Sequence, residues 1–258
     1  MKKSTKSRLT VYAVIAALIS TLTASAVTAA PISEVNTASV TASNAQTNEK
    51  TTVKKVNYDT KMKPIDWDVD VRLKYGHEAM AISAMLNFYG VKSTPKEIYN
   101  CFPKYECTDP NGIWKHTPYD AYVYTPDRKG YCYTPVVKKG VEKYLKKKGI
   151  KNLEVVEITG FTEKDLKKEI KNGNPVFVVG VSLPNGVVYD EFKLKDGSTL
   201  KTPISISYVV SKYAYSKAYG DNVYYMDCYF GGVGTYSSAM DFFKPTGYQA
   251  IVIHKKKS

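Results

Sequence analysis

Histidine, glutamine and closely spaced cysteines are scarce in this sequence, and the scarcity limits the metal sites that it can form. The chain has three histidines, and no two of its four cysteines are separated by only two residues. Structural zinc sites are usually built from such cysteine pairs and from histidines three to five residues apart. The histidines at 77, 116 and 254 are far apart. The spacing therefore excludes the usual zinc-site patterns, and we expect no cofactor.

Long apolar runs are also missing, except for one near the start of the chain. Four basic residues within the first eight precede an apolar run from Val11 to Leu22, and small residues follow. The run is too short for a comfortable membrane span, and the pattern is that of a secretory signal peptide. We assign it to residues 1–29, with cleavage after Ala29 and a second candidate site at Ala24-Ser25-Ala26. We expect a secreted or cell-surface protein with no transmembrane segment after cleavage.

Large apolar side chains are rare in residues 30–56, which are rich in Ser, Thr, Asn and Ala. Such a segment cannot bury enough surface to offset the entropy of ordering, so we predict a disordered linker. Residues 57–254 form the predicted domain, whose length suits one domain with a sizeable core. Residues 255–258 are a basic tail.

Lysine is abundant throughout the predicted domain. The loss of a signal peptide with four basic and no acidic residues lowers the formal net charge from +13 to +9. Lysine runs on two predicted helices are typical of a solvated face, and the alternative is attraction to anionic wall polymers or to a membrane surface. Nucleic acid is not an expected partner, because an exported chain seldom meets it. The lysines on these helices are Lys143, Lys146, Lys147, Lys148, Lys151, Lys164, Lys167, Lys168 and Lys171.

The cysteines are even in number, which in an exported chain favours one or two disulfides. Three pairings are possible if all four pair, and buried thiols are the alternative. The cysteines are Cys101, Cys107, Cys132 and Cys228.

The stretch from Tyr75 to Gly90 predicts a central helix. Its residues are too apolar for a surface helix, and Gly76 and Gly90 stand at its two ends. His77 falls in the first turn, where the positive end of the helix favours an anion. A histidine at this point is the first candidate functional residue.

Helices and then strands follow in order. Cap residues followed by proline predict helices that begin at Thr94 and Thr134, and Thr162 with Asp165 predicts a third. Residues 102–131 show no periodicity and are predicted to form a long loop. Helices in the first half and antiparallel strands in the second predict an α+β fold. The strands are predicted at residues 153–158, 175–182, 187–194, 199–202, 204–215, 223–228 and 248–253.

Tyrosines gather in the predicted loop. Tyr122 and Tyr124 are candidates for a groove that binds peptide or glycan, because tyrosine gives contact area at a low cost in entropy. Packing in the core is the alternative role.

Several segments together resemble the peptidase C39-like family, which comprises exported bacterial relatives of the papain-like cysteine peptidases. Gly76-His77-Glu78-Ala79 and the segment 86–90 resemble the family's G-C-E-A and L-N-Y-Y-G signature. Segments 166–176, 223–227 and 242–253 resemble later parts of the same family. The resemblance covers residues 57–253 and implies a papain-like, two-lobed fold, with a helical N-terminal half and an antiparallel sheet in the C-terminal half.

The resemblance also implies where catalytic groups would stand. The family uses a cysteine at the helix start, a histidine on a facing strand, an Asp or Asn on the next strand and a glutamine that donates to the oxyanion. These positions hold His77, Ser207, Asp227 and the segment 69–71, and the chain's two glutamines, at 46 and 249, lie elsewhere. Only the acid is retained.

We therefore expect a catalytically inactive member that keeps the cleft for binding a peptide or a cell-wall polymer. The alternative is an active cysteine peptidase with a rearranged site, which uses Cys228 or Cys132 with His77. Strand alternation weakens the case for Cys228, since Asp227 and Cys228 point to opposite faces. A metal site of His77, Asp227 and His116 is a third possibility, although a histidine bonded to a carboxylate is the commoner arrangement.

Overall fold

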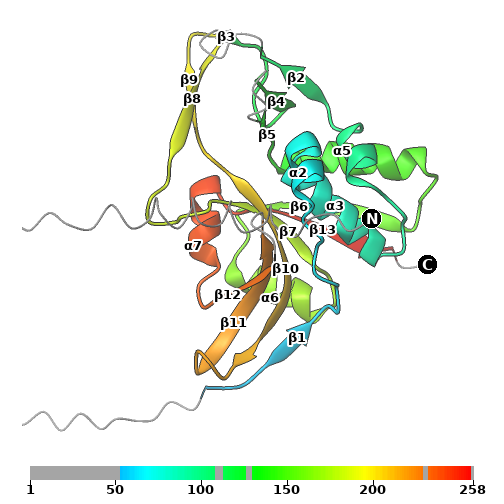
Figure 1. Ribbon diagram of the computed structural model, residues 1–258, viewed down its shortest axis with the longest axis vertical. Helices are drawn as coiled ribbons and strands as arrows, with labels where there is room; N and C mark the ends of the chain where they lie inside the picture. The colour runs from blue at the N-terminus through cyan, green and yellow to red at the C-terminus, as the bar shows by residue number, and fades with distance from the viewer. Residues whose placement is uncertain (1–52, 108–112, 126–129, 229–231, 257–258) are drawn as a thin grey trace, which may run out of the picture. The chain divides into compact units, whose positions relative to one another are not determined.

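Helices pack on both faces of a seven-stranded sheet in the computed structural model, which describes residues 53–107, 113–125, 130–228 and 232–256 (Figure 1). The predicted signal peptide, residues 1–29, and residues 30–52 of the predicted linker lie outside these ranges. So do residues 257–258 of the basic tail. No helix in the described ranges is long and apolar enough to cross a membrane.

The main sheet has the strand order β12-β11-β10-β7-β13-β6, and β1 pairs with β10. All of its pairings are antiparallel, as the sequence predicts. The strands are β1 (Asn57–Asp59), β6 (Leu153–Thr159), β7 (Val176–Gly180), β10 (Ile206–Ser216), β11 (Asp221–Cys228), β12 (Val233–Tyr236) and β13 (Gln249–Lys255).

Two small sheets replace the long loop that was predicted for residues 102–131. One has the order β2-β4-β5, and the other joins β3 to the hairpin β8-β9 around Asp196-Gly197. The prediction was wrong because the strands within this segment are only two or three residues long, too short to show a periodicity in the sequence. The strands are β2 (Lys104–Glu106), β3 (Ile113–Trp114), β4 (Tyr122–Tyr124), β5 (Gly130–Tyr131), β8 (Tyr189–Leu194) and β9 (Thr199–Pro203).

The predicted helices are present, but one of the predicted caps is not. Thr94 and Thr162 form capping boxes with the residues three positions later, as predicted. Thr134 is instead the first residue of its helix, is fully buried, and donates its hydroxyl to Glu157 at 2.7 Å. The helices are α2 (Val69–Tyr75), α3 (His77–Phe88), α4 (Pro95–Tyr99), α5 (Thr134–Lys147), α6 (Glu163–Lys171), α7 (Met240–Phe243) and the short 3₁₀ helix η1 (Lys244–Thr246).

Each face of the main sheet contributes to its own apolar core. Because side chains alternate along a strand, Val209 of β10 packs with α3 and α5, whereas Tyr208 and Val210 pack with α6 and α7. Before the irregularity that follows Val210, the α3 side therefore receives the odd-numbered residues of β10, and Ser207 is one of them.

Helix α3 is the buried central helix that was predicted. Ala79, Ala81, Ile82 and Met85 are all inaccessible to solvent. Gly76, with φ of 80°, forms the N-cap, and a Cβ atom there would lie 2.9 Å from a carboxyl oxygen of Glu78. A side chain at the helix entrance would therefore be strained both by the backbone angle and by this close contact.

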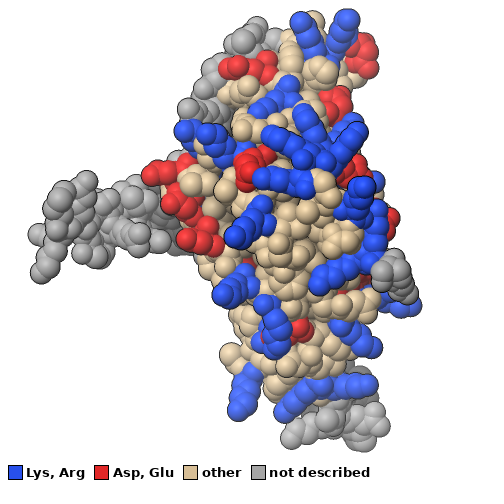
Figure 2. All heavy atoms as spheres, turned by 90° about the vertical axis from the view of Figure 1, so that its right-hand side faces the viewer, with Lys and Arg blue, Asp and Glu red and all other residues tan. Residues whose placement is uncertain are grey.

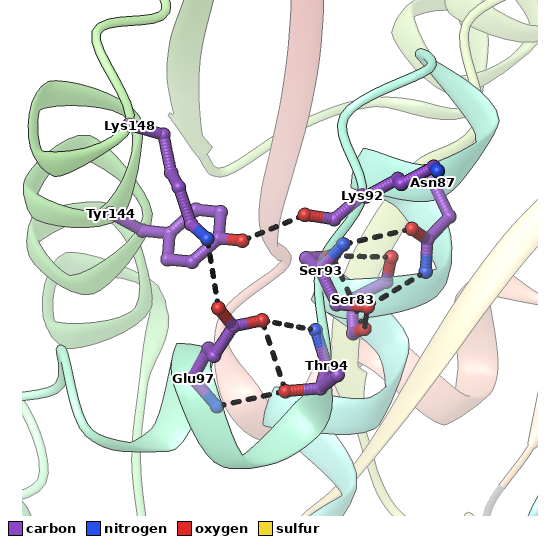
Figure 3. Close-up of polar contacts among 8 residues, drawn as sticks. All are labelled: Ser83, Asn87, Lys92, Ser93, Thr94, Glu97, Tyr144 and Lys148. Carbon is purple, nitrogen blue, oxygen red and sulfur yellow. Dashed lines mark hydrogen bonds and ion pairs between the residues drawn. The ribbon is translucent and has the colours of Figure 1, made fainter.

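Hydrogen bonds tie the other end of α3 to its neighbours (Figure 3). The amide of Asn87 donates to the carbonyl of Ser93 at 3.1 Å and accepts from its N–H at 3.0 Å. The Tyr144 hydroxyl of α5 donates to the carbonyl of Lys92 at 2.9 Å. These bonds hold the turn after α3 against α5, which helps to fix the position of α3 over the sheet.

Candidate functional site

His77 begins α3 and touches Ser207 of β10. The Nδ1 atom of His77 lies 3.0 Å from the Ser207 hydroxyl and accepts the backbone N–H of Ser207 at 3.2 Å. Ser207 is fully buried, and the His77 side chain is 14% exposed. The structure thus brings together two of the residues that the resemblance places at family catalytic positions.

The Ser207 amide determines which nitrogen of His77 carries the proton. A backbone N–H can only donate, so Nδ1 must present its lone pair, and the proton of the neutral ring is on Nε2. A second proton on Nδ1 would face this amide donor directly. Burial, together with the positive charge of Arg72, lowers the pKa of His77 to about 3. His77 is therefore a neutral hydrogen-bond acceptor at physiological pH.

Glu78 is a site residue that the sequence interpretation overlooked. It is 2% exposed, and its Oε1 atom lies 3.2 Å from Nδ1 of His77. Burial raises the pKa of Glu78 to about 8, so the carboxyl group is mainly protonated at neutral pH. The contact is then between two neutral groups rather than an ion pair. The available sequence signal was a charged residue type within a helix whose other residues are mostly apolar.

Asp227 lies on the same face of the sheet as Ser207. It pairs with Val209 in the β10–β11 register, two residues along from Ser207, which makes Asp227 and Ser207 diagonal neighbours. Asp227 is 1% exposed, and within the described residues its Oδ1 atom has no hydrogen-bond partner. Burial raises the pKa of Asp227 to about 6, opposed by a hydrogen bond from the backbone of Ile65.

A serine-type proton relay does not fit this geometry. In a Ser-His-acid triad, the serine and the acid bind opposite nitrogens of the imidazole. Here Ser207 and Glu78 both approach Nδ1 of His77. Protonated Glu78 also cannot act as the anionic partner that stabilises an imidazolium.

The position expected for the oxyanion glutamine holds the first turn of α2, residues 69–71. Gln249 lies on β13, where its amide accepts from the Thr134 hydroxyl at 3.0 Å and donates to the carbonyl of Thr246 at 2.6 Å. This glutamine is 3% exposed and serves to connect α5, β13 and η1.

The cysteines do not supply a reactive thiol within the described part of the chain. Cys132 is fully buried, and burial followed by the nearby Glu78 raises the pKa of its thiol well above the usual value. Cys101 and Cys132 are free thiols, so neither takes part in a predicted disulfide, and Cys107 is also buried. Cys228 pairs with Tyr208 in the register, so its position belongs to the opposite face, but its side chain lies outside the described residues.

The predicted metal set is not assembled. Among the residues that the structure describes, no group of three or more His, Cys, Asp or Glu side chains could hold a metal ion. His116 is paired with Asp120 at 3.1 Å, and His254 is paired with Glu169 at 2.9 Å.

Tyr122 is a core residue rather than part of an open groove, which corrects the prediction from its sequence position. It is 8% exposed and stacks on Phe102 with 6.2 Å between ring centroids. The reason is that β4 is the middle strand of its small sheet and directs this ring toward the entrance of α3. Tyr124 is half-buried against the same core.

We predict that Glu78→Gln removes a fall in stability at mildly alkaline pH. Glu78 keeps its proton in the folded protein up to a pKa of about 8, whereas a carboxyl group in the unfolded chain loses its proton near 4.5. Unfolding therefore releases a proton, and stability falls as pH rises. Above pH 6.5 His77 is mainly neutral in both the folded and the unfolded state. Between pH 6.5 and pH 8, the pH dependence of stability contributed by these two residues therefore comes mainly from Glu78.

Urea denaturation at several pH values should show the free energy of unfolding decreasing by up to about 2 kcal/mol across this window in the unmodified protein. Glu78→Gln should flatten the profile, and the exposed control Glu142→Gln should leave it unchanged. Identical profiles for the unmodified protein and Glu78→Gln would show that Glu78 is ionised in the folded state.

Comparison with known proteins gives one informative likeness, and it is structural. No protein-family model matches the sequence, and comparison with curated protein sequences finds no match. The fold is similar to the crystal structure of a Bacillus anthracis protein assigned as a C39-like peptidase, with a TM-score of 0.58 and 18% identity. The match covers 80% of this chain and 100% of the other. The described part of this chain thus has helices and antiparallel sheets arranged as in a C39-like peptidase fold.

Proposed function

We propose that this protein is an exported C39-like peptidase domain that lacks peptidase activity and binds a peptide or a cell-envelope polymer. The observation that carries the proposal is the hydrogen bond from the Ser207 amide to Nδ1 of His77. The proposal includes the papain-like arrangement of two lobes. Export rests on the signal-peptide pattern of residues 1–29.

The state of His77 supports the absence of hydrolysis. A neutral imidazole has one basic lone pair, and here that lone pair accepts the Ser207 amide. Nε2 carries the proton, so the ring has no available lone pair to attack a carbonyl or to remove a proton from water. The matching strand position holds a buried serine hydroxyl, which is not a base at physiological pH. Neither member of the family's Cys-His pair has a working replacement.

Exposed apolar side chains close to β10 in sequence support a binding role. Leu183 is 66% exposed, Val188 61% and Ile204 44%. The N–H of Ile204 donates to the carbonyl of Val188 at 2.9 Å, which places these two side-chain positions opposite each other at the base of the β8-β9 hairpin. Ile204 is three residues before Ser207. In our proposal this apolar surface contacts the ligand, which the sequence had predicted for Tyr122 but which the burial of Tyr122 prevents.

Incubation of the purified protein with a diverse peptide library should produce no cleavage above background, as measured by mass spectrometry. The proposal predicts the same result for His77→Ala. Cleavage by the unmodified protein that is lost in His77→Ala would contradict catalytic silence and would identify His77 as an active group.

A pair of variants tests whether positions 77 and 207 correspond to the family's cysteine and histidine. In His77→Cys combined with Ser207→His, an imidazole beside the new thiol should lower its pKa below about 7.5. The single variant His77→Cys should keep a clearly higher pKa. The measurement is the pH dependence of alkylation by iodoacetamide, with the unmodified protein as the background. Equal profiles for the two variants would show that the positions are not equivalent.

A further inference from the structure

Two adjoining hollows lie away from His77, one of them at the far end of α3. The first, of about 670 Å³, includes Phe88 and Tyr89, and the second, of about 640 Å³, lies along the end of α5. Glu154 and Lys256 line both hollows, so the two hollows adjoin, and we describe them together as one trough. At a rise of 1.5 Å per residue, the length of α3 separates this trough from His77 by roughly 17 Å.

Lysines dominate the charged groups of this trough. Six lysines and three glutamates line it, which gives a net charge of +3. We call this surface the lysine trough. Its lysines are Lys138, Lys146, Lys151, Lys168, Lys255 and Lys256, and its glutamates are Glu142, Glu154 and Glu169.

Two of the glutamates are already engaged with other groups. Glu142 lies 3.5 Å from Lys138, and Glu169 accepts from His254 at 2.9 Å and from Asn174 at 2.8 Å. The other five lysines are exposed, and within the described ranges none has a carboxylate oxygen within ion-pair distance. Their charges are therefore available to a ligand.

Interaction with a helix dipole accounts for the positions of only some of these lysines. Lys146 and Lys168 stand in the last turns of α5 and α6, where a cation complements the negative helix end. Each helix end is worth about half an elementary charge. Lys151, Lys255 and Lys256 follow the helices or end β13, so these three serve no helix terminus.

We propose that the lysine trough binds a linear polyanion whose repeating unit carries phosphate. Lysine ammonium groups bind phosphate as point charges, and their spacing along the trough suits a flexible chain. Figure 2 shows the face of the molecule on which α5 and the end of β13 lie, with many Lys and Arg side chains and fewer acidic ones.

The lining favours such a chain over a membrane or a nucleic acid. Of its aliphatic members, Leu145, Leu153 and Val155 are buried and Ile150 is half-buried, so none is an exposed apolar side chain that could insert into a bilayer. Sites for single-stranded nucleic acid present successive aromatic rings for stacking. Here the rings of Phe88 and Tyr89 occur at one end only and pack edge-on against each other.

The test is the binding of long-chain inorganic polyphosphate to the unmodified protein, followed over a range of NaCl concentrations. The trough variant combines Lys151→Gln, Lys168→Gln and Lys256→Gln. The control variant combines Lys193→Gln, Lys195→Gln and Lys217→Gln, which are exposed lysines outside the trough and give the same change in net charge. Thermal melting should show that both variants remain folded.

We expect the trough variant to bind polyphosphate at least about tenfold more weakly and to reduce the slope of log affinity against log salt by about 2, since each lost phosphate contact contributes about 0.7. The control variant should stay within about twofold of the unmodified protein. Equal losses of affinity in both variants would show that binding depends only on the net charge of the protein, and this would overturn the proposal. Absence of binding, or preferential binding to anionic vesicles or DNA, would overturn it as well. None of these results bears on the peptidase test, because that test concerns His77.

Discussion

The hydrogen bond from the Ser207 amide to Nδ1 of His77 is the interaction on which the candidate site depends. It joins the first residue of the central helix to a central strand of the sheet. Because the donor belongs to the backbone, its direction cannot be reversed by rotation of a side chain or by a change of protonation. The tautomer of His77 follows from this contact, whereas burial keeps both His77 and Glu78 neutral.

Two neutral groups in a buried site are physically reasonable. A buried ion pair must recover the cost of removing both charges from water, and it does so only with good geometry and further hydrogen bonds. His77 and Glu78 avoid that cost, since burial disfavours the charged form of each. The same environment disfavours a thiolate at Cys132. The entrance of α3, where the family resemblance places a reactive thiolate, is thus an environment that suppresses charge.

Local sequence signals predicted the elements that depend on local physics. Gly76 and Gly90 marked the ends of α3, the capping boxes at Thr94 and Thr162 marked two helix starts, and Asp196-Gly197 marked a hairpin. Strand alternation also predicted that positions 227 and 228 belong to opposite faces of the sheet.

The failures share a non-local cause. The strands between residues 102 and 131 are only two or three residues long and are defined by tertiary pairing, β2 with β4, β4 with β5, and β3 with β8 outside the segment. Thr134 resembles a cap locally, but its hydroxyl is bound by Glu157 and Gln249 after folding. Tyr122 is polar enough for a groove, yet its strand lies against the core. The role of Glu78 required knowledge of what surrounds α3.

The neutral acceptor state of His77 is the central claim, and nitrogen NMR of the imidazole tests it most directly. In protein labelled with ¹⁵N at histidine, the ring of His77 should show one protonated nitrogen, Nε2, and one unprotonated nitrogen, Nδ1, from about pH 5 to about pH 8. His77→Ala identifies its signals. An imidazolium pattern within this range, or a proton on Nδ1, would contradict the account.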